Sequence, residues 1–147
     1  MNSKRLFPWL IALLVLAAIA ADKPGTPGVI LLDHAKVAEV FARSGPLLAT
    51  NNFKVLALRR DGPGEVEIHD SDTDVLYVLE GSATLVTEGQ ATDSRKTAPG
   101  ETRAKSIVGG EAQHLTKGDV MVIQNGVPHW FKEVNPPFQY FMVKVAK

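Results

Sequence analysis

The sequence predicts an all-β fold, either a sandwich or a closed barrel, preceded by one short helix. Two observations support this prediction. From Asn52 onward, apolar residues recur with a period of two, and closely spaced turn sequences divide this part of the chain into many short segments. Closure into a barrel would also remove the exposed edge strands that an open sheet presents to solvent.

Length and composition indicate one globular domain. The chain has 147 residues, of which 45% are hydrophobic and 22% charged, and its formal net charge is +0. These values argue against a disordered chain and give no electrostatic basis for binding nucleic acid, so we expect no nucleic-acid partner. The chain has no cysteine, which excludes disulfides, thiolate metal ligands and a cysteine nucleophile.

The first 21 residues have the pattern of a secretory signal peptide. Lys4 and Arg5 precede the apolar run from Leu6 to Ala21, and Ala18-Ile19-Ala20 offers small residues for cleavage. An uncleaved N-terminal anchor is the alternative, although the run is shorter than the roughly 20 residues that span a membrane. We therefore expect cleavage, a periplasmic or secreted location, and no stable membrane insertion afterwards.

Residues 22–32 are expected to form a linker, because Asp22 to Gly28 holds two prolines and two glycines. The domain should then occupy residues 33–147. Its only convincing helix runs from Asp33 to Arg43, where Asp33 can act as the N-cap and Gly45-Pro46 ends the pattern. The apolar face of this helix consists of Val37, Val40 and Phe41.

Beyond the helix, seven segments have the composition of strands. They are Phe53–Leu58, Glu65–His69, Val75–Leu79, Ala83–Thr87, Ala112–Thr116, Val120–Ile123 and Gln139–Val145. Turn sequences such as Glu80-Gly81-Ser82 and Asn135-Pro136-Pro137 are expected to separate strands. Ala91 to Lys105 is polar and has no clear period, so it is predicted to be a loop between two halves of the barrel.

Two clusters of polar residues could carry chemistry. Glu67 and His69 are two residues apart on a predicted strand, so their side chains leave the same face. A carboxylate and an imidazole on an otherwise apolar strand are costly to bury unless they are paired or bind a metal. A hairpin would bring Asp74 beside His69. In the second cluster, His129 follows a glycine-containing turn and begins the next strand.

The first cluster, within residues 62–89, resembles the first sequence motif of the cupins, in which His-x-His, a glutamate and a glycine recur at fixed spacing. Anchored on Gly81, this spacing places Asp74 at the glutamate position and His69 at the second histidine. Glu67 takes the position of the first histidine. The chain therefore departs from the usual cupin motif at two of its metal-binding positions.

The second cluster, within residues 118–134, resembles the second cupin motif. Gly118, Gly126 and His129 match its spacing, and two other positions differ from it. The sequence is thus similar to small single-domain bacterial cupins. This resemblance implies a double-stranded β-helix, or jelly-roll, barrel with one short N-terminal helix.

The resemblance also implies that one divalent metal is bound by the four motif residues Glu67, His69, Asp74 and His129. Two imidazoles with one or two carboxylates suit Mn(II), Fe(II), Ni(II) or Zn(II), and loss of a histidine slightly favours Mn or Fe. Alternatives remain open at each residue. The histidines could be satisfied by carboxylates without a metal, Glu67 could pair with Arg59 or Arg60, and Asp74 could cap its turn.

The function implied by the resemblance is a metal-dependent enzyme of dioxygenase, isomerase or lyase type that acts on a small organic molecule. Glu67, if it does not bind the metal, could act as a general base. His114 is a second candidate for acid–base chemistry if it faces inward, although a surface position is the simpler interpretation. A non-catalytic cupin that binds a small ligand or a metal is the alternative, and a homodimer is compatible with either function.

Overall fold

The structure is a computed structural model that describes residues 28–147. The chain divides into two units, and the second unit, Leu31–Lys147, contains every helix and strand described. The predicted signal peptide, residues 1–21, and residues 22–27 of the predicted linker lie outside the described residues. Within residues 28–147, no helix is both long and apolar enough to cross a membrane.

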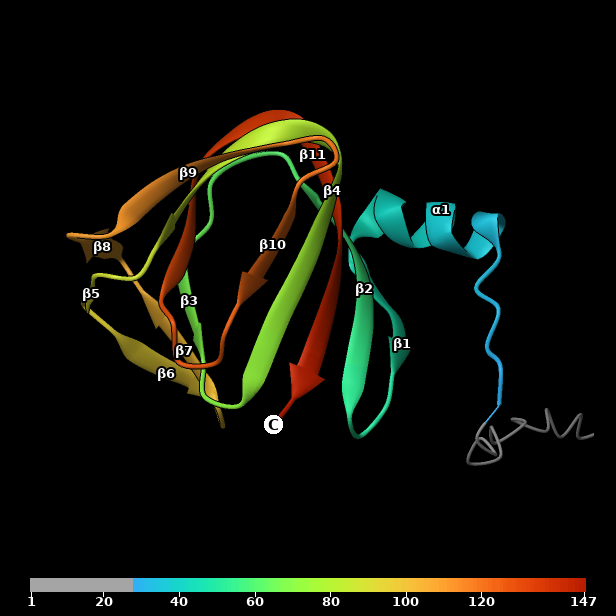
Figure 1. Ribbon diagram of the computed structural model, residues 1–147, viewed down its shortest axis with the longest axis horizontal. Coiled ribbons are helices and arrows are strands. Elements are labelled where there is room, and N and C mark those ends of the chain that lie inside the picture. The colour runs from blue at the N-terminus through green and yellow to red at the C-terminus, as the bar shows by residue number, and fades with distance from the viewer. Residues whose placement is uncertain (1–27) are drawn as a thin grey trace, which may run out of the picture. The chain divides into compact units, whose positions relative to one another are not determined.

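Helix α1 (His34–Arg43) forms where the sequence predicts it. The side chain of Asp33 accepts a hydrogen bond of 2.9 Å from the backbone N–H of Lys36, which caps the first turn. The apolar face packs against the sheet: Val40 is buried, and the rings of Phe41 and Phe141 lie 5.2 Å apart between centroids. This contact fixes the helix on the outside of the barrel (Figure 1).

The described chain forms eleven strands: β1 (Gly45–Ala49), β2 (Phe53–Arg60), β3 (Val66–His69), β4 (Asp72–Thr87), β5 (Gln90–Thr92), β6 (Arg95–Ala98), β7 (Glu101–Ala104), β8 (Ser106–Val108), β9 (Glu111–Thr116), β10 (Val120–Ile123) and β11 (His129–Ala146). All the pairs are antiparallel. The path β1-β2-β11-β3-β7-β6 forms one sheet, which β4 joins by pairing with β9, β10 and β11. The predicted all-β barrel is confirmed.

Strands β4 and β11 are the longest elements and curl together over the barrel (Figure 1). The sequence predicts turns at Glu80-Gly81-Ser82 and Asn135-Pro136-Pro137, but both stretches lie inside these strands, where the paired strands bend. Gly81 has a φ of +76°, and a Cβ there would collide with the carbonyl oxygen of Pro137. Glycine therefore permits the bend by its backbone conformation and its lack of a side chain.

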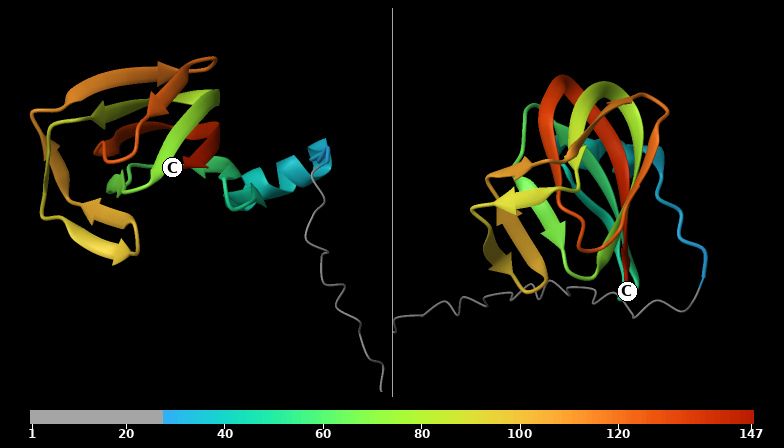
Figure 2. Two further views of the ribbon diagram at one scale, coloured as in Figure 1. Left: turned by 60° about the horizontal axis from the view of Figure 1, so that its bottom comes forward. Right: turned by 60° about the vertical axis from the view of Figure 1, so that its left-hand side comes forward.

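The predicted loop from Ala91 to Lys105 is wrong, because this stretch contains β6, β7 and most of β5. The period-two pattern is missing since all four residues of β6 are exposed. Ion pairs to neighbouring segments take the place of apolar contacts, with Arg95 bound to Glu65 and Lys96 to Asp70. Figure 2 shows these strands on the side of the barrel opposite α1. Strand β7 pairs with β3 and so reaches the candidate site.

The apolar core lies between the inner faces of β4 and β11. Its largest members are Leu76, Leu85, Phe131, Phe138 and Tyr140. The three aromatic rings lie 5.1 to 5.6 Å apart between centroids, which is typical of packed aromatic clusters. Polar residues of the candidate site lie on the inner faces of the same strands, next to this core.

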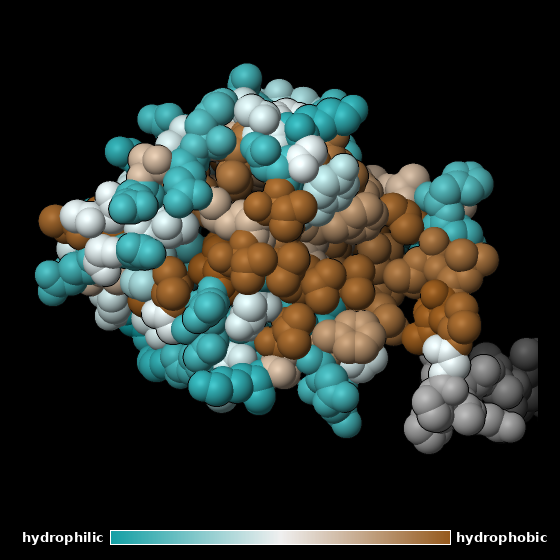
Figure 3. Space-filling model, viewed as in Figure 1, coloured by the Kyte–Doolittle hydropathy of each residue, from teal (hydrophilic) through white to brown (hydrophobic). Residues whose placement is uncertain are grey.

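A second group of apolar side chains lies on the outer face of the sheet, where β10, β4, β11 and β2 run side by side. Its exposed members are Val120, Val122, Tyr77, Val145 and Phe53. The strand register places Val120 beside Tyr77, and Val145 beside Phe53. Figure 3 shows apolar side chains gathered across this face of the molecule.

Candidate metal centre

The four predicted metal ligands meet inside the barrel. Glu67 and His69 leave the same side of β3, Asp74 lies near the start of β4, and His129 begins β11. The backbone pairing of His129 with Glu67 joins the two motifs directly. His69, Asp74 and His129 are only 3%, 1% and 3% exposed, so three ionisable side chains are buried together.

Three of these residues are placed to share one metal ion. Ligand atoms from Glu67, His69 and His129 all lie within 4.8 Å of one another. With ligand–metal distances of about 2.0 to 2.2 Å, two donors on one ion lie at most about 4.4 Å apart. The three donors themselves therefore need only a small movement to surround a metal.

Both imidazole rings are oriented by acceptors at Nδ1. The Nδ1 atom of His69 lies 2.8 Å from Oε2 of Glu101, and that of His129 lies 3.0 Å from the backbone carbonyl of Val127. Because a carbonyl can only accept, the Val127 contact places a proton on Nδ1 of His129. Nε2 of each ring then points toward the cluster, and this is how metal-binding histidines are held in proteins.

The two histidines differ in how tightly they bind a proton. Burial lowers the pKa of His129, so this ring is neutral near pH 7 and suited to bind a metal. Burial also acts to lower the pKa of His69, but the carboxylates of Asp74 and Glu101 outweigh burial and raise it. Protons therefore compete with a metal for His69 at a higher pH than for His129.

Glu67 is held by two arginines. One of its oxygens accepts a hydrogen bond of 3.0 Å from Arg60, and the other lies 3.5 Å from the guanidinium of Arg103. Burial would raise the pKa of Glu67, but Arg103 and Arg60 outweigh burial and lower it, so the side chain is a carboxylate at neutral pH. Of the two arginines considered as partners from the sequence, Arg60 makes the contact, whereas Arg59 binds Asp61.

Asp74 does not cap its turn; it is paired with Lys144 on β11, a residue that the sequence analysis did not identify. The ammonium donates to both carboxylate oxygens at 2.7 and 2.9 Å, and it lies 2.8 Å from Nε2 of His69. Asp74 Oδ2 also lies 3.7 Å from Nε2 of His129. Period-two spacing could have shown Lys144, because it follows Tyr140 and Met142 on the inner face of one strand.

His114, the second candidate for acid–base chemistry, does not join this cluster. It lies on β9 opposite Thr84 and is exposed. Its side chain lines a surface cavity together with Glu133 and Asn135. His114 therefore lies at the surface of the protein, as the simpler interpretation of the sequence predicts.

The cluster opens into a cavity of about 270 Å³. Its polar lining includes Glu67, His129 and Lys144 of the cluster, together with Arg59 and Arg60. Its apolar walls come from Leu56, Leu58, Phe131 and Met142. This volume suits a small organic molecule with an apolar part that can contact these walls.

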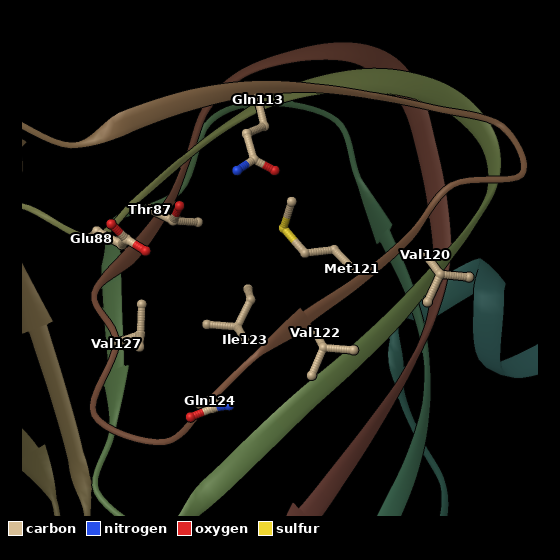
Figure 4. Close-up of a pocket in the computed structure, with 9 residues that line it drawn as sticks. All are labelled: Thr87, Glu88, Gln113, Val120, Met121, Val122, Ile123, Gln124 and Val127. Atoms are coloured by element: carbon tan, nitrogen blue, oxygen red, sulfur yellow. The ribbon is translucent and has the colours of Figure 1, made fainter.

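A second cavity, of about 500 Å³, lies between β9 and β10. Gln113 and Met121 point toward each other across it, with Ile123 beside them (Figure 4). None of the four predicted metal ligands lines this cavity. The smaller cavity is therefore the one that gives access to the candidate metal centre.

Comparisons with solved structures find the same fold at low sequence identity. KdgF from Halomonas sp. is 14% identical, with 71% of this chain and 79% of that chain covered and a TM-score of 0.51. A Bacillus halodurans protein is 14% identical over 86% of both chains, with a TM-score of 0.55. The DMSP lyase DddQ from Ruegeria pomeroyi is 13% identical, with 71% and 46% covered and a TM-score of 0.51.

A search of the curated proteins finds no match. The family model described as Cupin matches residues 21–147, which is most of the chain. This match includes both sequence motifs and all four residues of the candidate centre. The chain therefore belongs to the cupin family.

Proposed function

We propose that this protein is a metal-dependent enzyme that acts on a small organic molecule inside the cupin barrel. The observation that carries the proposal is the arrangement of Glu67, His69 and His129, whose ligand atoms lie within 4.8 Å of one another. The acceptors at Nδ1 support it further, because they direct both Nε2 atoms toward a common point.

Glu67, His69 and His129 would hold the metal, and Asp74 is the proposed fourth ligand. A bound divalent ion would supply Lewis-acid polarisation of a substrate oxygen. Mn(II) and Fe(II) are preferred over Ni(II) and Zn(II), because the carboxylates make the donor set harder than one built of histidines. Any Glu67 oxygen left free of the metal could accept a proton from the substrate.

The cavity supports a small substrate, since its volume is about 270 Å³ and its walls are largely apolar. We propose a reaction of dioxygenase, isomerase or lyase type. The polar end of the substrate would lie at Glu67 and His129, and its apolar part would contact Leu56, Leu58 and Met142.

Metal analysis of protein purified without added metal tests this function. We expect about one equivalent of a divalent metal, or a clear rise in melting temperature when Mn(II), Fe(II), Ni(II) or Zn(II) is added. His129→Ala should abolish binding, because it removes a buried imidazole ligand. His114→Ala is the matched control, since His114 is exposed and outside the cluster.

Two results would contradict the proposal. One is less than about a tenth of an equivalent of metal together with an unchanged melting temperature on adding each ion. The other is full metal occupancy in His129→Ala, which would place the metal elsewhere. Glu67→Gln tests whether the Glu67 carboxylate is a metal ligand. We expect this variant to bind the metal more weakly and to remain folded.

A non-catalytic cupin is the second candidate, and one observation favours it. The described carboxylates of the cluster already have cationic partners, with Glu67 bound to Arg60 and Asp74 bound to Lys144. Such a site could be stable without a metal and could bind a small ligand only. The same metal analysis separates the two functions.

We further propose that the protein is exported, which the signal-peptide pattern of residues 1–21 supports. The exposed apolar side chains on the outer sheet face are compatible with a homodimer. If the chain is exported, the protein recovered from the periplasm or medium should begin after Ala20 or Ala21. An intact mass that retains the first 21 residues would contradict cleavage.

A further inference from the structure

Lys144 lies where a cation is needed beside His69 and Asp74. Its ammonium contacts Nε2 of His69 at 2.8 Å and both oxygens of Asp74 at 2.7 and 2.9 Å. These are two of the four predicted metal ligands. The side chain is only 14% exposed, so the contacts are largely shielded from water.

A metal and this ammonium cannot occupy the site together. Nε2 of His69 has one position for either a hydrogen bond or a metal, and Lys144 uses it. A metal bound there would lie about 2.1 Å from Nε2, within the space now taken by the ammonium. Asp74 is engaged in the same way, because both of its oxygens accept hydrogen bonds from Lys144.

The charges of the cluster lead to the same conclusion. The carboxylates of Glu67, Asp74 and Glu101 are matched by three cationic side chains, those of Arg60, Arg103 and Lys144. A divalent ion would add two positive charges to this balanced group. Expulsion of one cationic side chain would lessen the repulsion that results.

Among these cationic side chains, Lys144 is the one best able to leave. Arg60 also binds the hydroxyl of Tyr140 and lies over the ring of Phe131, and Arg103 also binds Glu101. In contrast, the hydrogen bonds found for the Lys144 ammonium within residues 28–147 go to Asp74 and His69 alone. Lys144 also lines the 270 Å³ cavity, which gives its ammonium a place to move.

We propose that Lys144 is an internal cation that competes with the divalent metal for Asp74 and His69. This inference rests on the proposed function, because it concerns the same metal centre. Without metal, Lys144 neutralises Asp74 and keeps the buried ligands in place. When a metal binds, the ammonium leaves these two residues and enters the cavity.

Two variants test the inference. Lys144→Met removes the ammonium but keeps the length of the side chain, and Lys144→Gln retains an amide that can donate to Asp74. Lys54→Met is the matched control. Lys54 lies opposite Lys144 in the register of β2 and β11, but its ammonium contacts Asp72, at 3.6 Å. Zinc and manganese affinities are measured by calorimetry, and melting temperatures are measured with and without metal.

We expect both Lys144 variants to bind metal at least about tenfold more tightly than the wild type, a change of about 1.4 kcal/mol. Their metal-free melting temperatures should fall, because Asp74 loses its cationic partner, and added metal should raise them more than it raises that of the wild type. Lys54→Met should match the wild type in metal affinity.

The outcomes separate this inference from the proposed function. Binding by the variants but not by the wild type would support competition and reject a metal-dependent function for the natural chain. Equal or weaker binding by both variants, with a wild type that binds, would overturn competition alone. Absence of binding in all proteins would overturn both.

A measurement on the wild type keeps the inference testable if the variants do not fold. Acetylation of lysine amines, followed by mass spectrometry, reports how accessible Lys144 is. We expect slow modification of Lys144 in chelator-treated protein and faster modification at saturating metal, with Lys54 unchanged. An unchanged rate at Lys144 under saturating metal would overturn the inference.

Discussion

The buried carboxylate of Asp74 depends on a small number of polar contacts. Burial would raise its pKa, but the neighbouring His69 ring and the Lys144 ammonium outweigh burial and lower it. The pKa of Glu67 is lowered in the same sense, because Arg103 and Arg60 outweigh the effect of burial. The folded state is therefore more stable when both carboxyl groups are charged than when they are protonated.

The lowered pKa values predict a loss of stability in acid. A carboxyl whose pKa is lower in the folded state contributes stability above its unfolded pKa, and this is lost as pH falls through the folded value. We expect the free energy of unfolding of chelator-treated protein to fall as pH drops below about 4. Urea unfolding at a series of pH values measures it.

The variant Asp74→Asn tests whether protonation of Asp74 causes the loss of stability in acid. At pH 7 it should lower the free energy of unfolding by roughly 1 to 3 kcal/mol, because the Lys144 ammonium loses its carboxylate partner. Its stability should also vary less with pH than that of the wild type. Asp61→Asn is the control, since Asp61 is exposed and pairs with Arg59. Parallel pH profiles for the wild type and Asp74→Asn would contradict this explanation.

Single residues were predictable from sequence only where motif spacing identified them. Glu67, His69 and His129 occupy motif positions, and the structure brings them together. Lys144 and Glu101 could not be found in this way, because their contacts to Asp74 and His69 join residues 70 and 32 positions apart. Period-two spacing along β11 indicates only that Lys144 faces inward; which residues it and Glu101 contact follows from strand pairing.

At the level of elements, β3 and β7 show why the polar environment of the site was missed. The pairing of these strands sets His69 opposite Glu101, and Glu67 opposite Arg103. Strand β7 thus supplies Glu101, which orients the ring of His69, and Arg103, which stabilises the charged carboxylate of Glu67. Since the segment before β7 is polar on both faces, its sequence resembles a loop, and these contributions could not be anticipated.

In strands β4 and β11, turn-like sequences predict chain reversals that the structure does not contain. Gly81 and Asn135-Pro136-Pro137 have the composition of turns, but they face each other where two long strands bend together. The bend lets β11 place His129 at one end and Lys144 near the other. Both residues reach the cluster because the curled strand brings its two ends to the same part of the barrel.

For the whole molecule, the barrel was predictable and the order of its strands was not. Period-two segments and the two cupin motifs indicate the architecture, whereas the pairing of β11 with β2, β3 and β4 depends on long-range packing. The aromatic core and the polar cluster adjoin through Arg60, which binds the hydroxyl of Tyr140 and the carboxylate of Glu67. The fold thereby holds a charged, buried site against a rigid apolar support.

The proposed function requires that one divalent metal binds at Glu67, His69 and His129. A crystal structure of the protein saturated with Mn(II) or Zn(II), with the metal located by anomalous scattering, tests it most directly. We expect one peak in the barrel, about 2.0 to 2.3 Å from both Nε2 atoms and a Glu67 oxygen, with the Lys144 ammonium moved away. An empty barrel, or a metal bound only at exposed residues such as His114, would contradict metal binding at these three residues.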